Sequence, residues 1–138
     1  MGKVISAVTI MMLLAFSDVE LYKDGNYIGS SRSVYISEPY YGFVRIAVEN
    51  QKIRNVEFFI RDSLRHEIFD DRYERYFAGN ENYIAQCRND WKGIQSYPDS
   101  LLKYQDLNKV DVISGATWSY NIFKASAKKA LSAAANAK

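Results

Sequence analysis

Two neighbouring runs of alternating residues constrain the fold of this 138-residue chain more than any other feature. Residues 43–49 read FVRIAVE and residues 53–61 read IRNVEFFIR, with the short polar connection Gln51-Lys52 between them. Apolar and polar residues that alternate with a period of two are typical of half-buried strands. Two such runs around a short connection therefore predict an antiparallel β-hairpin.

The chain before this hairpin also predicts extended structure. Asp24-Gly25 is a turn dipeptide, and we expect a short strand on each side of it. Residues 33–37, SVYIS, alternate between polar and apolar and predict a further strand. Residues 38–42, EPYYG, contain Pro and Gly and predict a turn that leads into the hairpin.

The chain after the hairpin changes character and predicts helices. A loosely helical spacing relates Ile68, Tyr73, Tyr76 and Phe77. Gly79-Asn80 then has the composition of a helix end, and a second short helix is expected over residues 82–91.

A further helix is expected to begin at Pro98, with Asp99 or Ser100 as its capping residue. From Trp118 onward the chain is rich in Ala, with apolar residues for one face and lysines for the other, which predicts an amphipathic C-terminal helix. Strands followed by helices indicate an α+β fold. We expect a small antiparallel sheet with helices, including the Ala-rich C-terminal helix, packed on it.

Composition narrows the function classes. A chain of 138 residues fits one domain and excludes a two-domain dehydrogenase. Its 18 Lys and Arg against 16 Asp and Glu give a net charge of +2, too near neutral for an electrostatic nucleic-acid binder. One His and one Cys cannot build a structural zinc site, and Cys87 is expected to be a small buried hydrophobe. We therefore expect no nucleic acid and no metal as partners.

The N-terminus has the pattern of a secretory signal peptide. Residues 1–17, MGKVISAVTIMMLLAFS, contain one basic residue and then an uncharged run that is too short to span a membrane. Small residues at Ala15 and Ser17 fit cleavage before Asp18. A buried first element or an uncleaved membrane anchor are the alternatives. With cleavage, residues 18–138 form the mature domain and the protein is extracytoplasmic, either periplasmic, secreted or membrane-associated.

A short segment rich in small and hydroxyl residues is the clearest candidate for a functional site. Residues 111–119 read DVISGATWS, which predicts an extended piece that feeds a turn and opens a helix. Gly115 and Ala116 leave the backbone accessible, and the first N–H groups of a helix attract anions. The turn therefore suits either a phosphate or a plain Ser/Thr helix cap.

The residues Asp111, Ser114, Gly115, Ala116 and Thr117 form the pattern Asp-x-x-Ser-Gly-Ala-Thr. This pattern resembles the flavinylation motif of the FMN-binding domain family. The family includes the C subunit of the sodium-pumping NADH:quinone oxidoreductase, the G subunit of the Rnf complex and small secreted flavinylated proteins. Three further stretches, DGNYIG at 24–29, the hairpin at 42–58 and residues 107–111, resemble the same domain in the same order. The similarity spans about residues 20–135.

The resemblance implies that residues 18–138 bind FMN and that a flavin transferase attaches it. In the family, FMN is moved from FAD onto the last Thr of the motif as a phosphoester, which places the link on Thr117. The other four motif residues would be recognised by the transferase. Trp118 stands where the family has small or aliphatic residues, and could either stack on the flavin or anchor the C-terminal helix. Ser119 replaces a common Thr.

The function that this resemblance implies is electron transfer from a membrane redox donor to a downstream acceptor. We find no nicotinamide-binding fingerprint and no acid–base pair, so a carrier is favoured over a self-contained enzyme and no catalytic residue is predicted. A flavin-dependent reductase of a small acceptor is one alternative, with His66 or a Tyr as proton donor. A non-redox binding module that keeps the fold without flavin is another.

Overall fold

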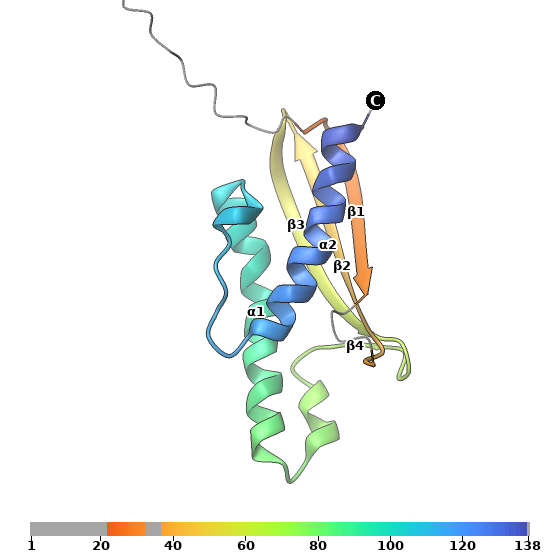
Figure 1. The fold of residues 1–138 in the computed structure, drawn as a ribbon, viewed down its shortest axis with the longest axis vertical. Coiled ribbons are helices and arrows are strands. Elements are labelled where there is room, and N and C mark those ends of the chain that lie inside the picture. The colour runs from red at the N-terminus through yellow and green to blue at the C-terminus, as the bar shows by residue number, and fades with distance from the viewer. Residues whose placement is uncertain (1–21, 33–36, 138) are drawn as a thin grey trace, which may run out of the picture.

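The computed structural model describes residues 22–32 and 37–137. The expected signal peptide at 1–17 and nearly all of the strand expected at 33–37 lie outside these residues. Four strands form one antiparallel sheet in the order β1-β2-β3-β4 (Figure 1). Their bounds are β1 Gly25–Arg32, β2 Tyr40–Glu49, β3 Lys52–Asp62 and β4 Glu67–Ile68.

The predicted hairpin is confirmed as β2 and β3. Glu49 pairs with Lys52, so the connection is Asn50-Gln51, one residue earlier than expected. Asn50 and Gln51 have φ values of 52° and 63°, as in the turns that match the twist of a hairpin. The turn expected over residues 38–42 is wrong in its second half, because β2 already begins at Tyr40.

The strand expected after Asp24-Gly25 is confirmed as β1, which pairs along its length with β2. The strand expected before this turn does not form at Tyr22 and Lys23. The N–H of Lys23 instead donates to the carbonyl oxygen of Ala134 at 3.1 Å, so the chain here is attached to the C-terminal helix rather than to the sheet.

One long helix, α1 (Glu81–Tyr104), replaces the two helices that the sequence predicts. Its N-cap is Asn80, whose side chain accepts from the N–H of Tyr83, and neither Asp99 nor Ser100 starts a helix. Pro98 lies inside α1. Proline costs a helix interior about 3 kcal/mol. That cost is offset because the buried stripe of α1 continues through Pro98 to Leu101.

The segment between the sheet and α1 is not an α-helix. Of the residues with loosely helical spacing, Ile68 lies in β4, whereas Tyr73, Tyr76 and Phe77 lie in the short 3₁₀ helix η1 (Tyr73–Phe77). Gly79, with φ of 87°, leads from η1 to the N-cap of α1. The stop predicted at Gly79-Asn80 is therefore confirmed, although it ends a shorter and tighter helix.

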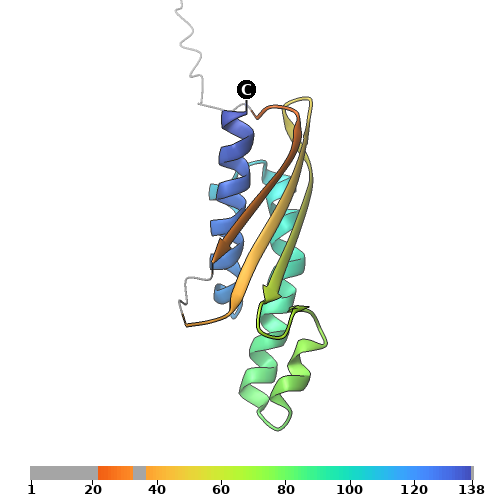
Figure 2. The same ribbon diagram turned by 90° about the vertical axis from the view of Figure 1, so that its right-hand side faces the viewer.

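The C-terminal helix is confirmed as α2 (Thr117–Asn136) and packs with α1 on one face of the sheet (Figures 1 and 2). Small residues allow this close packing. A Cβ on Gly29 would lie 2.0 Å from the carbonyl oxygen of Ser126, and a Cβ on Gly42 would lie 2.3 Å from Ile122. The fold is α+β, as predicted. None of the helices in the described residues has the length and apolar character needed to cross a membrane.

Candidate functional site

The candidate site lies where the chain returns from α1 to α2. After α1 comes the 3₁₀ helix η2 (Leu107–Lys109), then an extended piece over residues 110–113, then the tight turn Ser114-Gly115. The predicted order of extended piece, turn and helix is thus present. The seven predicted site residues differ in exposure. Asp111, Ser114, Gly115 and Thr117 are exposed, Trp118 is half-buried, and Ala116 and Ser119 are buried.

Thr117 is the first residue of α2 and its side chain is exposed. The N-cap residue is Ala116, which has no side-chain acceptor for the first N–H groups. Among the described residues, none forms a hydrogen bond with the Thr117 hydroxyl. The N–H groups of Thr117 and Trp118 have no acceptor within the helix. A free hydroxyl at the positive end of a helix can hold and accept a phosphate group.

A carboxylate from α1 takes the place of the missing cap. Asp90 is buried, with 2% of its surface exposed. Its Oδ1 accepts from the backbone N–H of Ser119 at 3.1 Å and from the Ser119 hydroxyl at 2.8 Å. Gln86 Nε2 donates to Asp90 Oδ2 at 2.7 Å and to the carbonyl oxygen of Gly115 at 3.0 Å. Ser119 is therefore buried and holds the start of α2 against α1.

Tyr97 connects both ends of the turn to α1. Its hydroxyl donates to the carbonyl oxygen of Ala116 at 2.8 Å and accepts from the N–H of Ile113 at 3.1 Å. Burial raises the pKa of Tyr97, so the hydroxyl stays protonated and keeps both bonds. Gly93 lets the turn approach, since a Cβ there would lie 2.6 Å from the Ser119 hydroxyl.

The sequence prediction missed these residues of α1. Gln86, Asp90, Gly93 and Tyr97 follow one another at intervals of three or four residues, so they lie on one face of the helix. The signal was present as polar and small residues at helical spacing. It was hidden because the sequence predicts two separate helices here.

Trp118 is attached to the core. Its Nε1 donates to Glu38 Oε2 at 2.7 Å, and its ring contacts Tyr40 and Phe69 with centroid distances of 5.0 and 5.3 Å. These contacts are those expected of a residue that anchors the start of α2.

A line of aromatic rings continues from Trp118 toward α1. After Phe69 come Tyr73, Phe77 and Tyr83, with successive centroid distances of 4.7, 6.2 and 5.2 Å. Tyr83 is 57% exposed. It lies one helical turn before Gln86, which holds the Ser114-Gly115 turn. An exposed aromatic face such as that of Tyr83 can pack against a flat ring.

A buried polar network holds these aromatics. Tyr73 donates to Asp62 Oδ2 at 2.6 Å, so the Tyr40 hydroxyl, 2.6 Å from that of Tyr73, is the donor to Tyr73. Burial would raise the pKa of Asp62, but hydrogen bonds from Tyr73 and from the N–H groups of Leu64 and Arg65 lower it. The carboxylate is therefore ionised and acts only as an acceptor.

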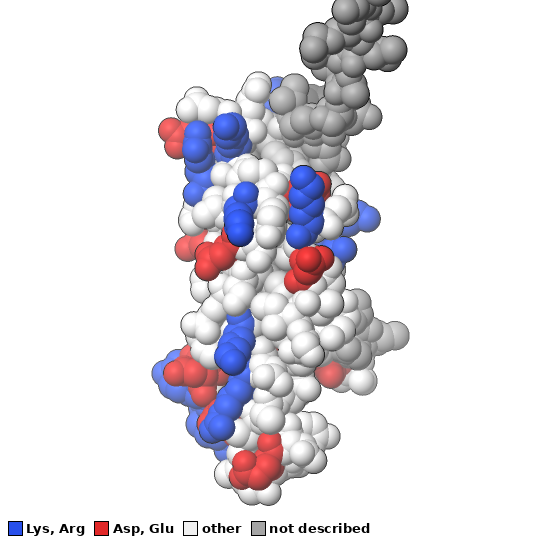
Figure 3. All heavy atoms as spheres, turned by 90° about the vertical axis from the view of Figure 1, so that its left-hand side faces the viewer, with Lys and Arg blue, Asp and Glu red and all other residues white. Residues whose placement is uncertain are grey.

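The surface charges are mixed. On the face that carries α1, Lys and Arg alternate with Asp and Glu among the described residues that are visible (Figure 3). Arg88 pairs with Glu74 at 2.8 Å and Arg75 pairs with Glu67 at 2.8 Å. This face therefore presents interspersed charges of both signs.

Comparisons with known proteins identify relatives. A model of the FMN-binding domain family matches residues 37–132, which contain the hairpin, α1, the Ser114-Gly115 turn and most of α2. The crystal structure of the CPE2226 protein from Clostridium perfringens is similar in fold, with a TM-score of 0.66 and 24% identity. The similarity covers 85% of this chain and 92% of that chain. No curated protein matches the chain significantly.

Proposed function

Since the chain belongs to the FMN-binding domain family, we propose that it is an extracytoplasmic electron carrier whose FMN is attached to Thr117. The observation that carries this proposal is the exposed Thr117 hydroxyl, which has no described partner and stands at the first position of α2. The residues present therefore fit a phosphoester of FMN.

The turn would hold the phosphate through its backbone. The N–H groups of Thr117 and Trp118 point along the axis of α2 and can donate to phosphate oxygens. The positive end of the helix stabilises the remaining negative charge by about 0.3–1 kcal/mol. Asp90 already occupies the N–H of Ser119, so the phosphate is expected to use the two earlier N–H groups. When bound, FMN supplies the one- and two-electron chemistry.

The protein's own contribution is to position the flavin. Half-buried Trp118 and exposed Tyr83, the two ends of the aromatic line, can offer ring faces to a flavin that is attached after the turn Ser114-Gly115, here called the attachment turn. The network of Asp62, Tyr73 and Tyr40 keeps that line rigid from behind. A flavin attached by its phosphate and packed on one side keeps another edge open to a redox partner.

Exposure also supports modification by a flavin transferase. Asp111, Ser114, Gly115 and Thr117 lie on the surface in one continuous stretch, so another enzyme can reach them without unfolding the domain. A membrane redox donor and a downstream acceptor complete the proposed electron path. The proposal that this path is extracytoplasmic rests on the signal-peptide pattern of residues 1–17.

Intact mass measures the proposed modification directly. The chain is co-expressed with a flavin transferase and secreted, and we expect a mass gain of one FMN on the peptide that carries Thr117. Thr117→Val keeps the shape of the side chain without its hydroxyl, and should be fully folded and unmodified. Ser132→Ala, exposed on the same helix, should be modified like the wild type. An unmodified wild type, or flavin on the Thr117→Val variant, would refute the phosphoester.

The same sample tests the N-terminus. We expect the secreted protein to begin at Asp18. An N-terminus at Met1 in a membrane fraction would instead support an uncleaved anchor.

A further inference from the structure

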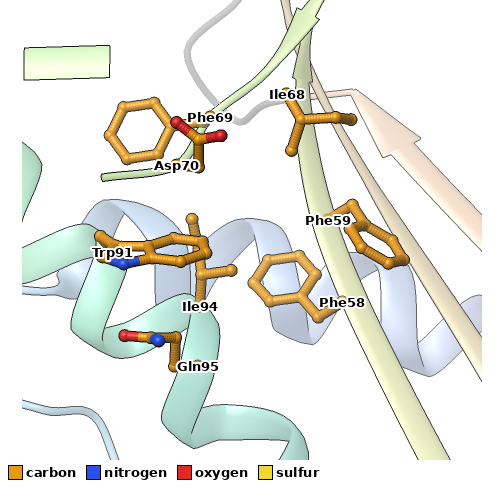
Figure 4. A pocket seen from close by; sticks show the side chains of 8 residues that line it. All are labelled: Phe58, Phe59, Ile68, Phe69, Asp70, Trp91, Ile94 and Gln95. Carbon is orange, nitrogen blue, oxygen red and sulfur yellow. The ribbon is translucent and has the colours of Figure 1, made fainter. Parts of the chain in front are cut away.

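An apolar pocket of about 260 Å³ opens between α1 and the edge of the sheet formed by β3 and β4 (Figure 4). Phe58, Phe69 and Ile94 form its buried base. Phe59 and Ile68 stand at its rim, and each leaves 41% of its surface exposed. Large apolar side chains that remain exposed around a concave site are typical of a binding site.

The walls of the pocket are held from behind. Phe58 packs on Phe123 at a centroid distance of 5.0 Å, and Phe69 packs on Tyr73 at 4.7 Å. The N–H of Phe69 donates to the carbonyl oxygen of Ile60 at 2.8 Å. These contacts keep the site formed in the absence of a ligand, which lowers the ordering cost of binding.

Two polar groups stand at opposite ends of the pocket, with Trp91 and Ile94 between them (Figure 4). One is Asp70, whose pKa is lowered by hydrogen bonds from Arg72, so it is ionised. Arg72 donates to both of its carboxylate oxygens, which leaves Asp70 few lone pairs for a ligand hydroxyl. The other is Gln95, whose amide can donate as well as accept. The pocket therefore matches a flat apolar ligand with an oxygen at each end.

We propose that this pocket binds a diffusible para-quinone of one or two rings, together with its hydroquinone. The volume lies just below the range of pockets for drug-sized ligands, roughly 300–1,000 Å³, which limits the ligand to a small ring system. The Gln95 amide donates to one oxygen. At the other end, a hydroquinone hydroxyl can donate to Asp70, and a quinone oxygen lies beside the Asp70–Arg72 ion pair.

The pocket adjoins the proposed flavin site, and its redox role rests on the proposed function. Phe69 lines the pocket and also contacts Trp118, the residue after Thr117, at 5.3 Å between ring centroids. Two electrons pass from the two-electron-reduced flavin to the quinone. The quinone gains two protons, the flavin loses its two electrons and two protons, and the products are hydroquinone and oxidised flavin.

The attached flavin is not the expected occupant. Asp90 faces the attachment turn through Ser119, while the next residue, Trp91, lines the pocket. Consecutive residues of an α-helix point about 100° apart, so the two sites lie on different faces of α1. Trp118 and Phe69 stand between them.

Binding of 2,3-dimethyl-1,4-naphthoquinone to the flavin-free Thr117→Val chain is measured by titration calorimetry. Both ring carbons of this probe are substituted, so it cannot add to a thiol. Ile68→Trp fills the mouth of the pocket and should weaken binding at least tenfold. Gln95→Leu removes one hydrogen bond and should weaken it about three- to tenfold. Lys92→Leu, exposed on the same helix and outside the pocket, should bind within about twofold of the unsubstituted chain.

The proposal would be overturned if the Thr117→Val chain shows no saturable binding. It would also be overturned if adding Ile68→Trp or Gln95→Leu leaves the affinity for the probe unchanged. Loss of binding in the flavinylated protein would also overturn it, because the flavin ring would then fill the pocket. With reduced flavinylated protein, Ile68→Trp should slow reoxidation by the quinone at least tenfold and leave reoxidation by ferricyanide unchanged. A missing FMN mass would refute the proposed function alone, since the Thr117→Val titration needs no flavin.

Discussion

At the residue scale, the turn that leads into α2 depends on a carboxyl group from another helix. Ala116 occupies the N-cap of α2 but has no side-chain acceptor, and Asp90 of α1 accepts from Ser119 instead. A helix is ordinarily capped by its own Ser, Thr, Asp or Asn. Because the cap comes from another helix, the N-cap position is occupied by the small residue Ala116, and the Thr117 side chain beside it stays exposed.

Asp90→Ala should destabilise the protein by about 2–3 kcal/mol, because hydrogen bonds to a buried charged group are lost and the N–H of Ser119 is left unpaired. Urea unfolding measures this change. Flavin attachment should also slow, since the turn before Thr117 loses its support. Asp99→Ala on the exposed face of α1 is the control and should change stability by less than about 0.5 kcal/mol. Equal effects of the two substitutions would contradict capping by Asp90.

Gly115 is required for two separate reasons. Its φ is 82°, and a Cβ would also lie 2.7 Å from Asn89 Nδ2. Gly79 has a similar φ of 87° but open space around it. Gly79→Ala should therefore cost about 1 kcal/mol from backbone strain alone. Gly115→Ala should cost about 1–2 kcal/mol more, unless Asn89 rotates away. Thermal unfolding of both variants compares them, and equal losses would show that the Asn89 contact is unimportant.

At the element scale, the hairpin turn has a residue that is not ideal for its conformation. Asn50 and Gln51 both have positive φ, and Asn-Gly is the preferred pair in such a turn. Gln51→Gly should stabilise the protein by about 0.5–1 kcal/mol, because the strain of a left-handed backbone is relieved. The bond from the N–H of residue 51 to Asp24 is kept. Gln51→Ala is the matched control, and a Gly variant no more stable than it in urea would argue against strain.

The continuity of α1 has a consequence for the site. Two separate helices, as the sequence predicts, could turn independently of one another. In a single helix, Gln86 and Tyr97 keep fixed positions relative to one another, and both donate to carbonyl oxygens of the turn before α2. The pocket and the turn then share one support, through different faces of α1.

At the scale of the whole molecule, one buried acid connects three parts of the fold. Asp62 of β3 accepts from Tyr73 of η1, and Tyr73 in turn accepts from Tyr40 of β2. The pKa of Asp62 lies below its ordinary value of 3.8 in the folded protein, so its carboxylate stabilises the fold above that pH. This stabilisation is lost as the pH falls through the lower folded pKa.

Asp62→Asn should therefore reduce the free energy of unfolding at neutral pH by about 1.5–3 kcal/mol. It should also make that free energy depend less on pH below about 4 than in the wild type. Chemical denaturation at a series of pH values measures both effects. Asp99→Asn, exposed in α1, should follow the wild-type profile. An Asp62→Asn profile as steep as that of the wild type would assign the acid sensitivity to other carboxylates.

The sequence by itself determined the features that depend on neighbouring residues. Alternation predicted the hairpin, the dipeptide Asp24-Gly25 predicted the start of β1, and the Ala-rich run predicted α2. The motif that ends at Thr117 also predicted the family, because its residues are consecutive or nearly so. Each of these signals is contained in a short window of the chain.

Only the tertiary structure decided the features that join distant residues. Asp90 and Ser119 are 29 positions apart, and neither residue type alone indicates that one caps the helix of the other. The pocket combines residues of β3, β4 and α1 in the same way. Pro98 was misread because its local cost was visible in the sequence, whereas the burial that offsets the cost depends on packing against the rest of the protein. Local preference is written in the sequence, but burial and long-range hydrogen bonds exist only once the chain has folded.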